Sequence, residues 1–284
     1  MRVWFSVSQR RILVIGRGSL GSALISAASL PVDSVDLPEI DLAVRGQARD
    51  FLRRVKPDWV LHTAAIADVD FCEQHPNDAW AVNAEGTREV AEVCAALGAR
   101  LLYTSSDSVF GKGEGPHSES DRPQPVNVYA ETKLAGEDAV REVPGSIIVR
   151  LPWLVGGERP DFVSFCIDRL RSGEEVVAFT DYIGYILTYE DAARVIWALL
   201  ADEGATGIFH LHRPPFLSRY EQAQAVAREL GKPELVRAGR VVDKPARVPR
   251  PTKMNLANSH GDHPAMRLLP SMEDTLRKLV RRAG

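Results

Sequence analysis

The stretch "RILVIGRGSLGSALISAASL" (residues 11–30) decides the fold of this chain. Residues 11–16 are mostly apolar, contain three β-branched side chains and end at a glycine, which predicts a buried strand. The small and apolar residues 19–30 predict a helix that packs closely on a sheet. Between them, glycines at 16, 18 and 21 form a G-x-G-x-x-G pattern. Strand, glycine loop and helix in this order are typical of a dinucleotide-binding βα unit.

Each glycine has a distinct expected role. Gly16 makes the tight turn, Gly18 lets the backbone approach a pyrophosphate, and Gly21 allows close packing of helix on sheet. The anion is expected at the N-terminus of the helix. The predicted cofactor loop comprises Gly16, Arg17, Gly18, Ser19, Leu20 and Gly21. A glycine-rich turn that binds no ligand is the alternative.

The sequence does not choose between NAD(H) and NADP(H). Asp36 lies about 20 residues after the first glycine, where a carboxylate binds a ribose 2′-hydroxyl and favours NAD. Asp41, followed by Leu42, is a second acidic candidate in the predicted cofactor set. Arg17, by contrast, is placed to meet the 2′-phosphate of NADP.

The rest of the first half alternates strand and helix patterns. Strands are predicted over 32–37, 58–67, 99–106 and 145–152, and helices over 47–58, 76–97 and 128–141. This alternation predicts an α/β fold with a Rossmann-type doubly wound parallel sheet. Beyond Leu151 the rhythm loosens, with helices predicted over 162–172, 190–200, 219–230 and 272–282, strands over 175–178 and 208–211, and a loop over 243–270.

We therefore expect an N-terminal extension over 1–10 and a dinucleotide-binding domain over 11–151. Residues 152–284 are expected to form mainly a smaller C-terminal substrate lobe, with some segments returning to the sheet.

Composition excludes several classes of function. The 284 residues carry a net charge of −3, so no basic excess indicates nucleic acid or an anionic membrane. No apolar run approaches the roughly 20 residues of a membrane span. Without a signal peptide, and with three cysteines lacking C-x-x-C spacing, a cytoplasmic location is expected. No metal site is predicted: His210 and His212 lack a third ligand, and Asp68, Asp70 and Glu73 are interpreted as a solvated acidic loop.

A pair of side chains after the fourth strand indicates proton transfer. Tyr129 and Lys133 are four residues apart in a predicted helix and share one face of it. A nearby ammonium is expected to lower the pKa of the tyrosine. A serine at the end of the strand over 99–106 is placed to hold a substrate carbonyl. An exposed amphipathic turn is the alternative, but the order of glycine loop, serine and Y-x-x-x-K favours catalysis.

At this point the chain resembles the extended short-chain dehydrogenase/reductases, and within them the dTDP-4-dehydrorhamnose reductases. The resemblance rests on "GRGSLG", "HTAAIADVDFCE", "AVNAEGT", "SSDSVF" and "NVYAETKLAGE", and continues through "VRLPWLVG" and "TYEDAARVI". It implies that Ser106 binds the carbonyl, Tyr129 is the catalytic acid and Lys133 its partner. It also implies further cofactor contacts at Ala64, Ala65, Ile66, Asn83, Ser105 and Leu151, and cofactor contacts of Tyr129 and Lys133 themselves. The implied substrate contacts are Ser106, Asp107, Ser108, Val109, Phe110, Trp153 and Arg250.

The chain departs from this family at three places. The glycine loop is one residue shorter than G-x-x-G-x-x-G, Ser108 replaces a tyrosine, and "GYILTY" (residues 184–189) replaces G-x-P-T-Y. The last two changes fall in the sugar pocket. Arg219 and Arg247 join Arg250 as candidates for binding a substrate diphosphate.

The resemblance implies an NAD(P)H-dependent reductase of a nucleotide-linked 4-keto-6-deoxy sugar, acting as a monomer or homodimer. The cofactor would give hydride to C4 and Tyr129 the proton. Two alternative functions are also compatible with the resemblance to this family. One is a sugar-nucleotide epimerase or dehydratase with tightly bound NAD. The other is a non-catalytic subunit like the regulatory subunit of some methionine adenosyltransferases.

Overall fold

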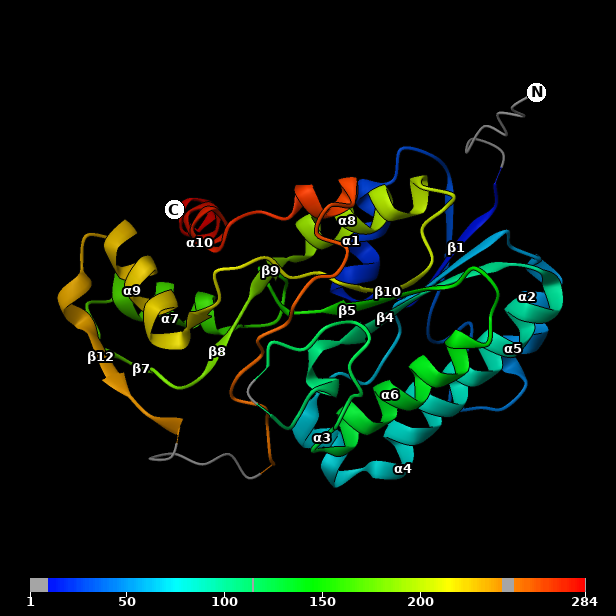
Figure 1. The fold of residues 1–284 in the computed structure, drawn as a ribbon, viewed down its shortest axis with the longest axis horizontal. Helices are drawn as coiled ribbons and strands as arrows, with labels where there is room; N and C mark the ends of the chain where they lie inside the picture. The colour runs from blue at the N-terminus through cyan, green and yellow to red at the C-terminus, as the bar shows by residue number, and fades with distance from the viewer. Residues whose placement is uncertain (1–9, 114, 242–247, 284) are drawn as a thin grey trace.

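A six-stranded parallel sheet forms the centre of the molecule (Figure 1). The computed structural model describes residues 10–113, 115–241 and 248–283, so residues 1–9 of the predicted extension over 1–10, and Arg247, lie outside the described residues. The strand order is β10-β5-β4-β3-β1-β2. These strands are β1 (Ile12–Ile15), β2 (Val32–Val35), β3 (Trp59–His62), β4 (Arg100–Ser106), β5 (Ile147–Leu151) and β10 (Gly207–His210).

Helices cover both faces of the sheet. On one face lie α2 (Gln47–Val55), α5 (Thr87–Leu97) and α6 (Val128–Arg141), and on the other lie α1 (Ser19–Ala27) and α8 (Tyr189–Ala201) (Figure 1). Successive residues of β1 serve opposite faces: Val14 packs in one core with Leu24, and Leu13 packs in the other with Leu52. Each buried aliphatic side chain stabilises the fold by about 1.5–3 kcal/mol. The predicted doubly wound α/β fold is therefore confirmed.

The strand order reverses at β1: β2 lies on one side of it, and β3 and the later strands lie on the other. Strand β1 pairs with β2 on one side and β3 on the other. The loops that follow β1 and β3 therefore lead in opposite directions and leave a crevice at the carboxyl edge of the sheet. Ligands bind in this crevice in open α/β sheets.

The helix predicted over 76–97 is continuous, and its middle segment is wound as a π-helix. It consists of α4 (Pro76–Ala79), a π-helical segment η2 (Trp80–Gly86) and α5. In this wide segment, the fully buried Asn83 pairs its amide with the backbone of Ile66 through hydrogen bonds of 2.8 and 2.9 Å. Such π segments are frequent at functional sites.

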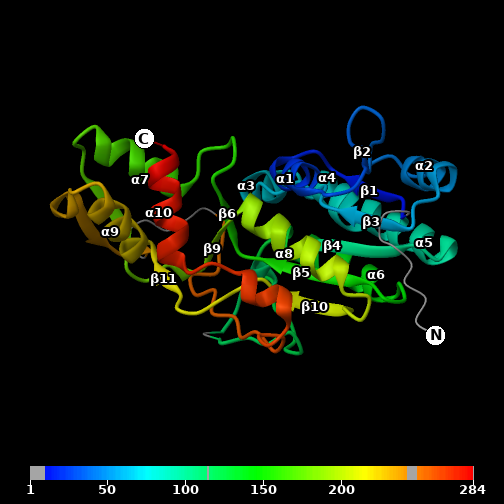
Figure 2. The same cartoon turned by 90° about the horizontal axis from the view of Figure 1, so that it is seen from above.

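A smaller lobe lies beyond the carboxyl ends of the strands (Figure 2). It contains α7 (Phe162–Arg171), α9 (Arg219–Glu229) and α10 (Met272–Arg282), together with three short strand pairs. The pairs are β6 (Trp153–Val155) with β9 (Ile186–Thr188), β7 (Val176–Phe179) with β12 (Val236–Gly239), and β8 (Ile183–Gly184) with β11 (Leu217–Ser218). All six of these strands have two to four residues, too few for a periodic signal, and only β7 was predicted, displaced by one residue.

One further feature differs from the expectations. The acidic stretch taken for a loop is the short helix α3 (Val69–Gln74), which Asp68 caps by accepting a hydrogen bond from the Phe71 N–H. Strand β10 and helix α8 come from beyond residue 151 and complete the sheet. Within the described residues, none of the helices has the length and apolar character needed to cross a membrane.

Candidate active site

The glycine turn after β1 has the conformation that its residues predict. Gly16 has a φ of +101°, and a side-chain carbon there would lie 2.6 Å from the backbone nitrogen of Ala64. A side-chain carbon on Gly21 would lie 1.8 Å from the carbonyl oxygen of Gly16, so the helix approaches the turn more closely than alanine allows. Gly18, in contrast, faces open space and lines a cleft. Gly16 thus forms the tight turn, Gly21 allows the close packing of the helix, and Gly18 leaves the backbone open to a ligand.

Helix α1 begins in this cleft without a side-chain cap. Its N-cap residue is Gly18, and no side chain of the described residues accepts a hydrogen bond there. The first N–H groups of a helix carry partial positive charge and bind anions such as phosphate. The first turn of α1 contains no acidic residue that would repel one.

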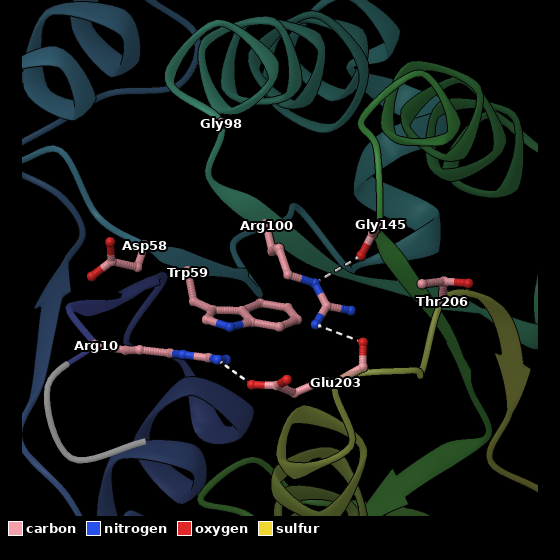
Figure 3. A pocket seen from close by; sticks show the side chains of 8 residues that line it. All are labelled: Arg10, Asp58, Trp59, Gly98, Arg100, Gly145, Glu203 and Thr206. Atoms are coloured by element: carbon pink, nitrogen blue, oxygen red, sulfur yellow. Dashed lines mark hydrogen bonds and ion pairs between the residues drawn. The ribbon is translucent and has the colours of Figure 1, made fainter. Parts of the chain in front are cut away.

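The cleft has a volume of about 1730 Å³ and runs from this turn to the lobe. Its floor is formed by residues that follow β1, β3, β4 and β5, and its far wall by residues of the lobe. A smaller hollow of about 440 Å³ lies at the opposite, amino ends of the strands (Figure 3). There Arg100 stacks 4.2 Å from the Trp59 ring and donates hydrogen bonds to the carbonyl oxygens of Gly145 and Ala205, so its donors serve the fold.

Tyr129 and Lys133 enter the large cleft from the first turns of α6. Asn127 caps this helix by accepting a hydrogen bond of 2.9 Å from the Ala130 N–H. The Lys133 side chain is buried, with Nζ 4.1 Å from the centroid of the Tyr103 ring. Burial lowers the pKa of Lys133 to about 7, against an opposing effect of Glu137.

The prediction that the pKa of Tyr129 is lowered is wrong. Burial raises the pKa of Tyr129 to about 12, because a phenolate in the cleft loses its hydration. A hydrogen bond with Ser106 opposes this rise, and the charge of Asp107 adds to it. Tyr129 therefore holds its proton at neutral pH.

Ser106 is the centre of a hydrogen-bonded group at the end of β4. Its hydroxyl accepts hydrogen bonds from the Ser108 hydroxyl at 2.9 Å and from the Ser108 N–H at 3.2 Å, and donates to Asp107 at 3.3 Å. The second carboxylate oxygen of Asp107 lies 3.3 Å from His212 Nε2. The replacement of tyrosine by Ser108 thus adds a second hydroxyl next to the first.

The sequence is similar to proteins of known family along almost its whole length. Residues 10–283 match the family model described as RmlD substrate binding domain. The dTDP-4-dehydrorhamnose reductase of Mycobacterium tuberculosis is 34% identical over 86% of this chain and 83% of its own. The chain belongs to this family.

Further relatives extend the likeness along the chain. The dTDP-4-dehydrorhamnose reductase of Mycolicibacterium smegmatis is 30% identical over 98% of this chain and 88% of its own. The same enzyme of Bacillus anthracis, solved in complex with NADP, superposes with a TM-score of 0.88 at 26% identity, over 96% of this chain and 99% of that one. As a member of the RmlD family, the protein is an NAD(P)-dependent oxidoreductase.

The structure brings most of the predicted family residues to the cleft. The predicted cofactor residues that line it are Arg17, Gly18, Ser19, Leu20, Gly21, Ala65, Ile66, Ser105, Tyr129, Lys133 and Leu151. The predicted substrate residues that line it are Ser106, Asp107, Ser108, Trp153 and Arg250.

Three predicted contact residues are buried away from the cleft. Asn83 positions the loop after β3 through its hydrogen bonds with Ile66, so it supports the site from behind. Val109 and Phe110 form a small buried cluster with Leu256, because the short 3-10 turn after Ser106 directs both side chains inward. These three are corrections to the predicted set.

The remaining predicted cofactor residues shape the backbone around the cleft. Asp36 accepts hydrogen bonds from the N–H groups of Arg17 and Leu37, at 2.6 and 2.8 Å. Asp41 accepts from the Ala43 N–H, and Leu42 packs beneath Gly86. Gly16 and Ala64 support the turn through the close approach described above.

Other weighed candidates have structural partners. His62 is fully buried beside Thr87, with Nε2 3.0 Å from the threonine oxygen, and burial lowers its pKa to about 3. Asp70 pairs with Arg250 at 2.7 Å. In the described part of the chain, no group of three or more His, Cys, Asp or Glu residues is arranged to hold a metal ion.

Sequence reasoning missed a buried ion pair behind α6. Glu137 accepts hydrogen bonds from Arg150 at 2.9 and 2.7 Å and from Ser105 at 2.6 Å, and both charged side chains are fully buried. Glu137 lies one helical turn after Lys133, so the spacing in "KLAGE" is the signal that could have indicated it.

Proposed function

We propose that this protein reduces the keto group at C4 of a nucleotide-linked 4-keto-6-deoxy sugar, as the named dTDP-4-dehydrorhamnose reductases do, with Tyr129 as the proton donor. One observation carries the proposal: Tyr129, Lys133 and Ser106 line the same cleft as the glycine turn, and the raised pKa of Tyr129 keeps its proton on the phenol. A general acid must hold its proton until charge develops on the reacting oxygen.

The residues present fit a nicotinamide dinucleotide. The uncapped start of α1 and the open space beside Gly18 suit a diphosphate, and the loop at Ala65 and Ile66 lines the path from there to Tyr129. When bound, the reduced nicotinamide supplies the hydride. Ser106 orients the carbonyl oxygen by hydrogen bonding, and Tyr129 transfers its phenolic proton to that oxygen. Lys133, when protonated, stabilises the phenolate that remains.

The test is reduction of dTDP-4-keto-6-deoxy sugars, followed by the absorbance of NADPH or NADH. We expect stoichiometric oxidation of the cofactor by the wild type. Tyr129→Phe should lower kcat by about 100-fold or more while cofactor affinity is retained, because it removes only the transferable proton. No turnover with any keto-sugar would overturn the proposal.

The same assay separates the alternatives. Cofactor that co-purifies, together with product formed without net cofactor oxidation, would indicate an epimerase or dehydratase. Cofactor binding without turnover would indicate a non-catalytic subunit. The division at residue 151, the cytoplasmic location and the monomeric or homodimeric state stay predictions.

A further inference from the structure

Tyr103, in the middle of β4, lies against the ammonium group of Lys133. The Lys133 Nζ is 4.1 Å from the centroid of the Tyr103 ring, so the ammonium meets the face of the ring and not its hydroxyl. Both side chains are buried, with 2% of Lys133 and none of Tyr103 exposed. The face of an aromatic ring carries partial negative charge and attracts a cation at this distance.

The ammonium of Lys133 has no direct polar partner in the part of the chain that the structure describes. None of these residues accepts a hydrogen bond from Nζ, and no carboxylate among them lies within 4.0 Å of it. Glu137 attracts Lys133 from one turn further along α6, but its oxygens accept hydrogen bonds from Ser105 and Arg150. Because a buried cation is costly without a partner, the contact with the Tyr103 ring carries more weight here than at an exposed site.

The other titratable groups around Lys133 are uncharged at neutral pH. Tyr129, on the same helix, keeps its proton because burial raises its pKa to about 12. Cys72 of α3 is also neutral, since burial raises its pKa to about 11. His62 of β3 is neutral because burial, together with the charge of Lys133, lowers its pKa to about 3. These three neighbours therefore neither pair with the ammonium nor repel it as charges.

The ring of Tyr103 is fixed by the packing of α6 on the sheet. His62 of the neighbouring strand packs against it, with ring centroids 5.5 Å apart. Helix α6 passes so close at Gly136 that a side-chain carbon there would lie 2.4 Å from the Tyr103 hydroxyl oxygen. Glycine at position 136 thus lets the helix that carries Lys133 approach the ring. The contact between ring and ammonium is therefore built into the fold.

We propose that Tyr103 is a positioning residue: the face of its ring holds the Lys133 ammonium at the cleft and stabilises its charged form. This inference rests on the proposed function, in which the charged Lys133 stabilises the phenolate left on Tyr129. Burial already lowers the pKa of Lys133 to about 7. A modest change in the contact with the ring therefore alters the charged fraction of Lys133 near neutral pH.

The test measures the titration of Lys133 directly, by NMR of protein that contains isotope-labelled lysine. The Lys133 resonance is identified by its absence in Lys133→Arg. Tyr103→Phe keeps the ring face and should keep the pKa of Lys133 close to its wild-type value. Phenylalanine with one, two or three fluorine atoms at position 103 withdraws negative charge from the ring face at nearly constant size. The pKa of Lys133 should fall with each fluorine, by about 0.5–1.5 pH units in all.

Tyr103→Leu removes the ring and should lower the pKa of Lys133 by a similar amount. Tyr185→Leu is the matched control, since Tyr185 is an equally buried tyrosine that packs in the other core, and it should leave the Lys133 titration where it is in the wild type. If Tyr103→Leu does not fold, the fluorinated series decides the question. A Lys133 titration that is the same with no fluorine and with three would overturn the inference.

The pH dependence of kcat/KM separates this inference from the proposed function. In the fluorinated variants, the fall of kcat/KM with rising pH should move to lower pH by as much as the Lys133 titration does. The NMR titration needs no turnover. Failure to reduce any keto-sugar would refute the reductase proposal, while a titration that shifts with fluorination would still establish that Tyr103 stabilises the ammonium. Turnover together with an unshifted titration would refute the role of Tyr103 alone.

Discussion

The buried pair of Glu137 and Arg150 should contribute strongly to holding α6 in place on the sheet. Glu137 lies on α6, two turns after Tyr129, and Arg150 lies on β5. The guanidinium donates through Nε at 2.9 Å and Nη2 at 2.7 Å, one hydrogen bond to each carboxylate oxygen. Both side chains are fully buried. The pair therefore fastens the helix that carries Tyr129 and Lys133 to the sheet.

Glu137→Gln keeps the size of the side chain and removes its charge. Arg150 would then be a buried cation whose main counter-charge is gone, and breaking such a pair costs about 3–5 kcal/mol of unfolding free energy. The substitution also weakens the hydrogen bond that Ser105 donates to Glu137 at 2.6 Å, because a carboxylate is a stronger acceptor than an amide oxygen. For a domain of this size the melting temperature should fall by roughly 6–20 °C.

Urea unfolding followed by circular dichroism measures this loss of unfolding free energy. The m value, which is the dependence of that free energy on urea concentration, should be the same for all variants. The double variant Glu137→Gln/Arg150→Met should recover much of the loss, because it removes the unpaired cation together with its partner. Arg141, which also donates to Glu137 at 2.9 Å but is partly exposed, supplies the control: Arg141→Gln should cost less than about 1 kcal/mol. A loss below about 1 kcal/mol for Glu137→Gln, or no recovery in the double variant, would refute the reasoning.

Two further predictions concern the reaction. The pKa of about 7 for Lys133 means that its ammonium is present below pH 7 and lost above it, so kcat/KM should fall as pH rises through about 7. Lys133→Arg keeps its charge and should remove this fall. A wild-type profile without an inflection between pH 6 and 8.5 contradicts this. Ser108→Ala removes the hydroxyl that donates to Ser106 at 2.9 Å and should lower kcat about 2- to 10-fold with unchanged NADPH affinity. Full activity in this variant would show that Ser108 does not help to orient Ser106.

The sheet could be predicted because its signals are local. Strands β1 and β3 and the middle of β4 are buried on both faces, so their composition alone indicates strands of a parallel sheet. The placement of Tyr129, Lys133 and Ser106 also followed from order, since parallel strands bring their carboxyl ends to one edge.

The missing parts depend on contacts between distant residues. Arg219 meets Trp153 only because the lobe folds over the sheet, and no pattern near either residue announces the other. The raised pKa of Tyr129 has the same origin: its sign depends on burial, which the four-residue spacing to Lys133 does not report. Val109 and Phe110 could not be oriented from sequence either, because a single tight turn decides whether they face the cleft or the core.

Strand β5 links the two halves of the site. Arg150, near its end, binds Glu137 of α6, and Trp153, three residues later on β6, forms the surface against which Arg219 stacks. Arg150, which is bonded to α6, and Trp153, which lines the cleft, are therefore parts of one short segment. A displacement of this segment should change kcat and substrate affinity together.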